Sequence, residues 1–195
     1  AFTNTYKLEP ANAAITAKKV LDGKALEAGN YTFKLTEVGG NNVELQATND
    51  ANGDIKFPEI NYDKEGTYTY KLTEVAGNEA GVTYDSAEHT VTVTVTENNA
   101  KLEAAVTDNN PTFTNRYKDY GVSYEFLSSN PAYPNLPKEV TDLLPADTNR
   151  YTSGTNVDAK QPAKTSVTVT EGTWTFEGYA ETNAQTVADK DLKFT

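Results

Sequence analysis

Polar and apolar residues alternate along much of this chain, a pattern that predicts β-strands rather than helices. The clearest run is His89–Thr96, in which threonine and valine alternate strictly. Similar runs occupy Ile15–Leu21, Asn30–Glu37 and Tyr68–Glu74. Because successive side chains of a strand point to opposite sides, each run presents one apolar face to a core. The sequence therefore predicts a mainly β protein.

Three polar residues fall on the apolar faces of their predicted strands. Lys19 shares a face with Ile15 and Leu21, Glu74 follows the tyrosines and leucine of its run, and Asn115 lies between Phe113 and Tyr117. Burying an unpaired ammonium or carboxylate is costly. We therefore expect the lysine, the glutamate and the asparagine to meet in one core and to neutralise or react with each other.

The alternation does not exclude a second candidate for the buried acid. Residues 29–38 nearly repeat residues 66–75, so Glu37 is a rival to Glu74. Lys18 cannot replace Lys19, because its side chain points to the opposite side of the predicted strand. A different interpretation is that the ammonium of Lys19 reaches solvent, Asn115 satisfies a backbone turn and Glu74 faces water.

Asn52-Gly53 lies between two strand-like runs, Val43–Thr48 and Ile55–Ile60, and predicts a type I′ hairpin. Acidic residues beside this turn could suggest calcium, but the glycine and distal glutamate of an EF-hand loop are missing. We therefore expect a plain turn and no metal site.

The second half of the chain begins with a strand-like run, Val122–Leu127, and continues through a proline-rich loop. A short helix is predicted from Pro137 to Pro145. Strands at Val167–Thr170 and Thr173–Phe176 form a hairpin, and Leu192–Thr195 supplies a last strand. Trp174 is expected in the core.

Composition narrows the function. The 195 residues include no cysteine, so neither disulfides nor thiolate metal sites are available. The net charge of −11 argues against nucleic acid as a partner. No run of about 18 apolar residues occurs, so we expect no membrane span. His89 is the only histidine, which leaves no histidine pair or triad.

Most of the first half of the chain resembles a known family. Residues 12–117 are similar to the isopeptide-linkage domain of Gram-positive pilins, as in the streptococcal T-antigen backbone pilin. The resemblance is carried by a lysine in the first strand, Gly-x-Tyr-x-Tyr followed by a glutamate, and Phe-Thr-Asn-x-Tyr at residues 113–117. It implies a β-sandwich, a Lys19–Asn115 isopeptide bond and Glu74 as the assisting acid, which hydrogen-bonds the amide oxygen and passes protons. Phe2–Tyr6 echoes the same last motif, so residues 1–11 are expected to be the tail of a preceding repeat, with Asn4 unbonded.

Residues 120–195 resemble a SHIRT module, the streptococcal high-identity repeat in tandem. The strings that carry this resemblance are Val122–Phe126, Leu136–Val140, Leu144–Asp147 and Gly172–Tyr179. We place the domain at 118–195, as a small β-rich α+β unit with one short helix, arranged end to end with the first.

The two resemblances imply a structural stalk segment of a cell-wall-anchored surface protein in a Gram-positive bacterium, on the extracellular surface, which projects a tip adhesin. Expected partners are neighbouring repeats of the same chain and, through a distant tip domain, host ligands. We expect a monomer with no cofactor, no nucleic acid and no membrane partner, and no enzyme activity beyond a single intramolecular turnover. The alternative is an adhesin module that binds host glycan or protein through the Ser128–Leu136 loop, which carries Tyr133. A hydrolase is the weakest option, because no cleft signature or nucleophile motif accompanies the carboxylates.

Overall fold

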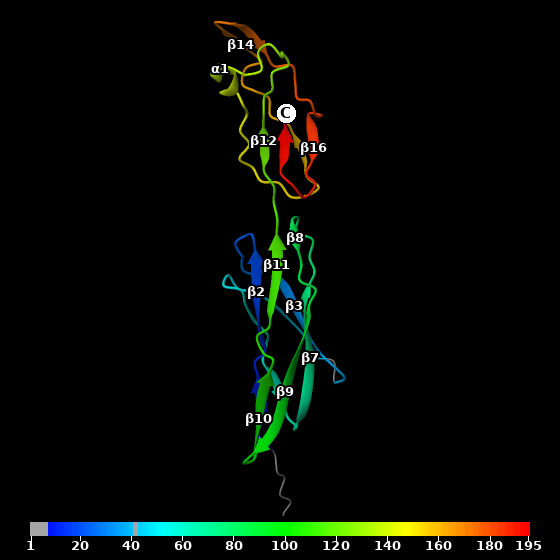
Figure 1. Cartoon of the computed structure of the whole chain (residues 1–195). Coiled ribbons are helices and arrows are strands. Elements are labelled where there is room, and N and C mark those ends of the chain that lie inside the picture. Colours follow the sequence, from blue (N-terminus) through cyan, green and yellow to red (C-terminus); the bar gives the residue numbers. More distant parts are fainter. Residues whose placement is uncertain (1–7, 41–42) are drawn as a thin grey trace, which may run out of the picture. The chain divides into compact units, whose positions relative to one another are not determined.

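The computed structural model describes residues 8–40 and 43–195. The chain divides into two compact units, Ala1–Tyr117 and Lys118–Thr195. Strands are the main regular secondary structure of both, and the described residues include one short helix (Figure 1). The expectation of a mainly β chain is confirmed.

Two sheets build the first unit. One is antiparallel, in the order β10-β9-β7-β3-β4, and the other has the order β5-β2-β11-β8. A separate pair joins β1 and β6. The strands are β1 (Ala11–Ala13), β2 (Thr16–Asp22), β3 (Thr32–Glu37), β4 (Glu44–Thr48), β5 (Asp54–Lys56), β6 (Ile60–Tyr62), β7 (Gly66–Val75), β8 (Val82–Thr83), β9 (Glu88–Asn98), β10 (Lys101–Thr107) and β11 (Thr112–Tyr117).

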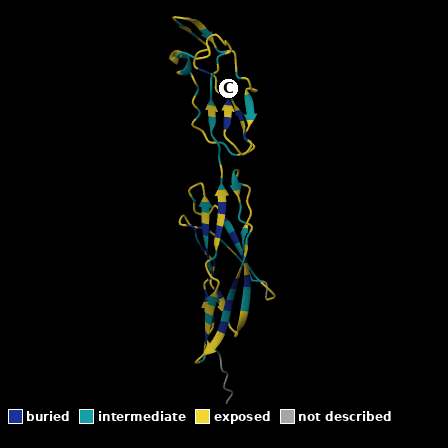
Figure 2. Ribbon diagram, viewed as in Figure 1, coloured by how far each residue is buried: buried dark blue, intermediate teal, exposed yellow. Residues whose placement is uncertain are grey.

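The core lies between these two sheets. Buried positions alternate with exposed ones along the strands (Figure 2). Phe33 on β3 and Phe113 on β11 are fully buried, and their ring centroids are 5.1 Å apart. This contact between strands of different sheets gives the sandwich its apolar filling.

The first and last long strands of the unit are neighbours. β11 pairs with β2 in parallel, with Phe113 opposite Lys19 and Asn115 opposite Leu21. β7 belongs to the facing sheet, where Glu74 lies opposite Phe33 of β3. The register thus brings residues from both ends of the unit to one place in the core.

One detail of the first unit differs from the sequence-based expectation. Asn52-Gly53 forms a turn with one bridge, between Asn49 and Ile55, but β4 and β5 then pair in different sheets. Of the two turn residues only Gly53 has a positive φ, of 85°, so the turn is not type I′, in which both central residues have a positive φ.

The expected tail is described only in part. Residues 1–7, including Asn4, lie outside the described residues. In the described part, Leu102 N donates to Glu9 O at 2.9 Å.

The second unit consists of three strand pairs and a helix. The pairs are β12 (Val122–Tyr124) with β17 (Leu192–Phe194), β13 (Asn156–Asp158) with β16 (Ala184–Thr186), and β14 (Ser166–Val169) with β15 (Gly172–Thr175). The expected hairpin and last strand are present. Val157, Val187 and Leu192 form its small core.

The helix α1 (Lys138–Thr141) is shorter than expected, because it ends before Leu143. Beyond Thr141 the chain tightens, because Leu143 N donates to Val140 O and Leu144 N to Thr141 O, both at 3.1 Å and both three residues back. Pro145 then disfavours helical geometry in the residue before it. Trp174 is half-buried and lies outside the buried core. It sits on β15, whose only sheet partner among the described strands is β14.

Candidate functional site

Lys19, Glu74 and Asn115 meet inside the sandwich of the first unit. Lys19 Nζ lies 2.6 Å from Glu74 Oε2, and Asn115 Nδ2 donates to Glu74 Oε1, also at 2.6 Å. The side chains of Lys19 and Glu74 are fully buried, and Asn115 has no exposed surface. One carboxylate therefore bridges the two nitrogens, away from solvent.

The backbone of Lys19 is held by the turn that precedes β5. Lys19 N donates to Gly53 O at 2.7 Å. A Cβ at Gly53 would lie 2.1 Å from Lys19 O. The backbone φ of Gly53 is +85°, a value that residues other than glycine rarely adopt. This position requires glycine, because the turn approaches the strand that carries the lysine so closely.

Aromatic rings surround the amine. Lys19 Nζ lies 4.8 Å from the ring centroid of Tyr31 and 5.8 Å from that of Phe33. Burial lowers the pKa of Lys19, although the hydrogen bond and charge of Glu74 oppose that shift. A lowered pKa raises the fraction of neutral amine, which is the nucleophilic form.

The amide of Asn115 has a defined orientation. Its Oδ1 accepts a hydrogen bond from Asp85 N at 2.7 Å, and its Nδ2 faces Glu74. We expected Glu74 to contact the amide oxygen, and here it contacts the nitrogen instead. A backbone N–H can only donate, so Asp85 requires the oxygen on its side.

The rival residues lie elsewhere. Glu37 is paired across the sheet with Tyr70, at the opposite end of β3 from Phe33 and its partner Glu74. Lys18 points away from the core and pairs with Asp54 at 2.8 Å. Sequence reasoning missed Asp85 and assigned Gly53 only to a hairpin.

Other classes of site find no support in the described part of the chain. No group of three or more histidine, cysteine, aspartate or glutamate residues there could hold a metal ion. None of the described helices is long and apolar enough to span a membrane.

Family comparison identifies both units. The family model of the Spy0128-like isopeptide-containing domain matches residues 15–118, more than half of the chain. The chain belongs to this family. The model of the SHIRT domain matches residues 118–195, so a SHIRT domain follows the isopeptide domain. The recognition of both families from the sequence is confirmed, and neither is a family of enzymes.

The chain also aligns with solved structures of streptococcal surface proteins. The major pilin from Streptococcus pyogenes is 21% identical over 58% of this chain and 53% of the pilin, with a TM-score of 0.41. Tandem SHIRT domains 3-4 from a cell surface protein are 21% identical over 92% of this chain and 94% of theirs, with a TM-score of 0.37. The T-13 major pilin is 16% identical over 64% and 57%, with a TM-score of 0.41. The chain thus spans little more than half the length of these pilins, and comparison with curated proteins found no match.

Proposed function

We propose that the isopeptide domain forms an intramolecular bond between Lys19 Nζ and Asn115 Cγ, with Glu74 as the acid that moves the protons. The observation that carries this proposal is the Glu74 carboxylate, which contacts the reacting amine and the departing amide nitrogen at 2.6 Å each. Burial favours the neutral amine that the reaction needs. The bond would be made once per molecule, during folding.

The protons can be followed through the same contacts. Glu74 Oε2 takes a proton from Nζ, and the amine lone pair attacks Asn115 Cγ. Glu74 gives that proton to Nδ2, so that ammonia departs with the two amide hydrogens and one more. The Glu74 carboxylate then takes the second proton from the attacking nitrogen and ends protonated. The core holds the reactants in contact, which supplies effective molarities on the order of 10⁵ M or more.

The bonded domain is suited to a structural stalk. The relatives are streptococcal pilins and a cell surface protein, so we place this chain in a cell-wall-anchored stalk on the outside of a Gram-positive cell. Its partners in that role are the neighbouring repeats of its own chain, and it acts as a monomer. A tip adhesin beyond the stalk would contact the host.

Intact mass tests the bond. The wild-type chain should be one ammonia lighter than its calculated mass, whereas Lys19→Ala and Glu74→Ala should each have their full calculated mass. Lys18→Ala is the matched control, because Lys18 is an adjacent lysine whose side chain is partly exposed and pairs with Asp54. It should lose ammonia like the wild type. A wild-type chain of full mass would refute the proposal.

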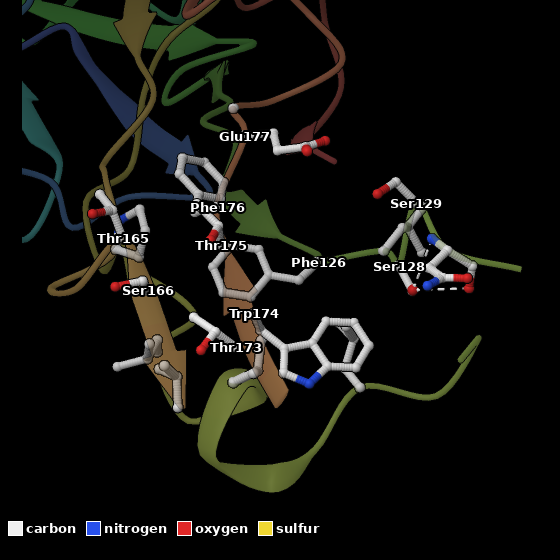
Figure 3. Close-up of a pocket in the computed structure, with 18 of the residues that line it drawn as sticks. Phe126, Ser128, Ser129, Thr165, Ser166, Thr173, Trp174, Thr175, Phe176 and Glu177 are labelled. Carbon is white, nitrogen blue, oxygen red and sulfur yellow. Dashed lines mark hydrogen bonds between the residues drawn. The ribbon is translucent and has the colours of Figure 1, made fainter. Parts of the chain in front are cut away.

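A second candidate function is supported by a pocket in the SHIRT domain. The pocket has a volume of about 740 Å³ and is lined by aromatic rings, hydroxyls and the carboxylates of Glu125 and Glu177. Figure 3 shows the rings of Phe126, Trp174 and Phe176 along it. Aromatic faces with nearby hydrogen-bonding groups suit a glycan, and the Ser128–Leu136 loop also contributes to the lining.

Tryptophan fluorescence can test this alternative. Trp174 is the only tryptophan of the chain and lines the pocket. A glycan that enters the pocket should change the emission on titration, and Tyr133→Ala should weaken the response. Tyr31→Phe, in the isopeptide domain, should not alter it. A glycan array that stays blank would leave the stalk as the better description.

A further inference from the structure

The loop between β8 and β9 contributes a group to the isopeptide site that the Lys-Glu-Asn trio does not include. β8 pairs with the end of β11, with Thr83 opposite Arg116. The chain then continues to Asp85, beside the residues of β11 that precede Arg116. Asp85 N donates to Asn115 Oδ1 at 2.7 Å. This is the atom on which negative charge develops when an amine attacks the amide carbon.

The side chain of Asp85 fixes that N–H in place. Its Oδ2 accepts a hydrogen bond from Thr114 N at 2.8 Å, and its Oδ1 accepts one from Ala87 N at 2.9 Å. The first bond ties the loop to the residue next to Asn115. The second closes an Asx turn that directs the chain into β9. Both of its carboxylate oxygens therefore hold the backbone that presents the donor.

Charge at this position is consistent with that role. Burial acts to raise the pKa of Asp85, but the hydrogen bonds from Thr114 and Ala87 and the charges of Lys19 and His89 outweigh it, and the pKa is lowered. The carboxylate therefore stays ionised at neutral pH. An ionised acceptor makes stronger hydrogen bonds to backbone N–H groups than a neutral one does.

We propose that Asp85 is a positioning residue for isopeptide formation, whose N–H orients the Asn115 amide and stabilises the oxyanion on Oδ1. This role rests on the proposed Lys19–Asn115 bond. When Nζ attacks Cγ, the carbonyl electron pair moves onto Oδ1, and the Asp85 N–H stabilises the negative charge there through its hydrogen bond. When the carbon–nitrogen bond breaks, the pair returns to the carbonyl and Nδ2 leaves as ammonia with a proton from Glu74.

The same N–H decides which end of the amide faces the acid. If the amide were turned around, Nδ2 and Asp85 N would be two donors in contact, and the leaving nitrogen would lie away from Glu74. A donor aimed at a developing oxyanion contributes about 10²- to 10³-fold in rate in acyl-transfer enzymes. Asp85→Ala keeps the N–H but frees it, so we expect bond formation at least about tenfold slower.

The test follows ammonia loss in the full chain after cell-free synthesis, with samples quenched in acid and analysed by intact mass. Asp85→Ala should react at least tenfold more slowly than the wild type. Asp85→Asn should be intermediate, because it keeps an oxygen for Ala87 N but loses an acceptor for Thr114 N. Asp147→Ala is the matched control, since Asp147 also accepts the N–H of the residue two positions on, in the SHIRT domain. It should react at the wild-type rate.

Two measurements separate positioning from simple loss of folding. Each variant is also made in the Lys19→Ala background, which cannot react, and its melting shows whether the first unit is folded at the assay temperature. In that background, amide NMR should show a slowly exchanging Asp85 N–H that exchanges faster once Asn115→Ala is added. If Asp85→Ala proves unfolded, Asp85→Asn decides the rate comparison.

The outcomes are distinct. A wild-type chain that never loses ammonia overturns the bond and the role of Asp85 together. A wild-type chain that reacts, alongside an Asp85→Ala or Asp85→Asn chain that is folded and equally fast, overturns the role of Asp85 alone. The role of Asp85 is also overturned if the exchange rate of its N–H does not change when Asn115→Ala is added.

Discussion

Removing Asn115 tests how much the proposed cross-link stabilises the isopeptide domain. The bond closes a loop of about 100 residues, and the chain-entropy relation for disulfides gives about 4 to 5 kcal/mol for a loop of that length. Asn115→Ala also leaves Asp85 N without the oxygen that accepts its hydrogen bond, at about 1 to 3 kcal/mol. The free energy of unfolding should therefore fall by at least about 5 kcal/mol.

Calorimetry of the full chain measures this change with an internal reference. The two units have separate cores, so we expect two transitions. About 5 kcal/mol corresponds to a decrease of about 20 °C in the midpoint of the first unit, at about 4 °C per kcal/mol for a domain of this size. The transition of the second unit should not move.

Asn61→Ala is the matched control for this prediction. Asn61 is an exposed asparagine of β6 that donates to Asn12 Oδ1, and its removal should change stability by no more than about 0.5 kcal/mol. If Asn115→Ala lowers the first transition by only about 4 °C or less, no cross-link of this kind stabilises the domain.

Three further predictions follow from the contacts above. In Glu74→Gln the buried Lys19 lacks its counter-charge, so the folded state binds fewer protons than the unfolded state between the lowered pKa of Lys19 and the ordinary 10.5. The free energy of unfolding, measured by denaturant titration, should therefore rise with pH over that range by about 1.4 kcal/mol per pH unit. A flat profile would contradict this. Gly53→Ala places a Cβ against Lys19 O, so it should destabilise the first unit by about 1 to 3 kcal/mol in the same assay and slow the loss of ammonia. An unchanged rate of ammonia loss would mean that the turn does not position the lysine. Asp147→Ala should destabilise the second unit by about 2 to 4 kcal/mol, because the nearly fully buried Asp147 carboxylate accepts hydrogen bonds from Tyr151 OH and Lys160 Nζ. In calorimetry only the second transition should move to lower temperature, and movement of the first transition instead would refute the prediction.

Periodicity along a strand is local, so the sequence is sufficient to assign Lys19 and Asn115 to inward faces. It is not sufficient to choose between Glu37 and Glu74, because the segments that carry them are near copies. That choice is made by strand pairing: β3 and β7 are antiparallel, which places the two glutamates at opposite ends of the pair. Only the end with Glu74 faces Lys19.

Features that depend on distant contacts escaped sequence reasoning. Asn52-Gly53 indicates a turn, but the dipeptide does not determine that the following strand joins the other sheet. Asp85 carries no local signal for its role, since its partners Thr114 and Asn115 lie 29 and 30 positions along the chain. Trp174 is of a residue type that is usually buried, yet its hairpin joins no other described strand and its ring lines a pocket.

The position of the proposed bond decides what force would do to the isopeptide domain. β2 and β11 are parallel neighbours, so tension applied to the start of β2 and the end of β11 shears the pair along its length. Without a cross-link, only backbone hydrogen bonds and packing resist, and about 95 residues between Lys19 and Asn115 extend when they fail, a gain of about 320 Å. With the bond, the load passes from Lys19 directly to Asn115 and those residues stay folded. Single-molecule pulling of the full chain should therefore show one extension event, from the SHIRT domain, and Asn115→Ala should add a second, longer one; two events in the wild type would show that the load is not diverted.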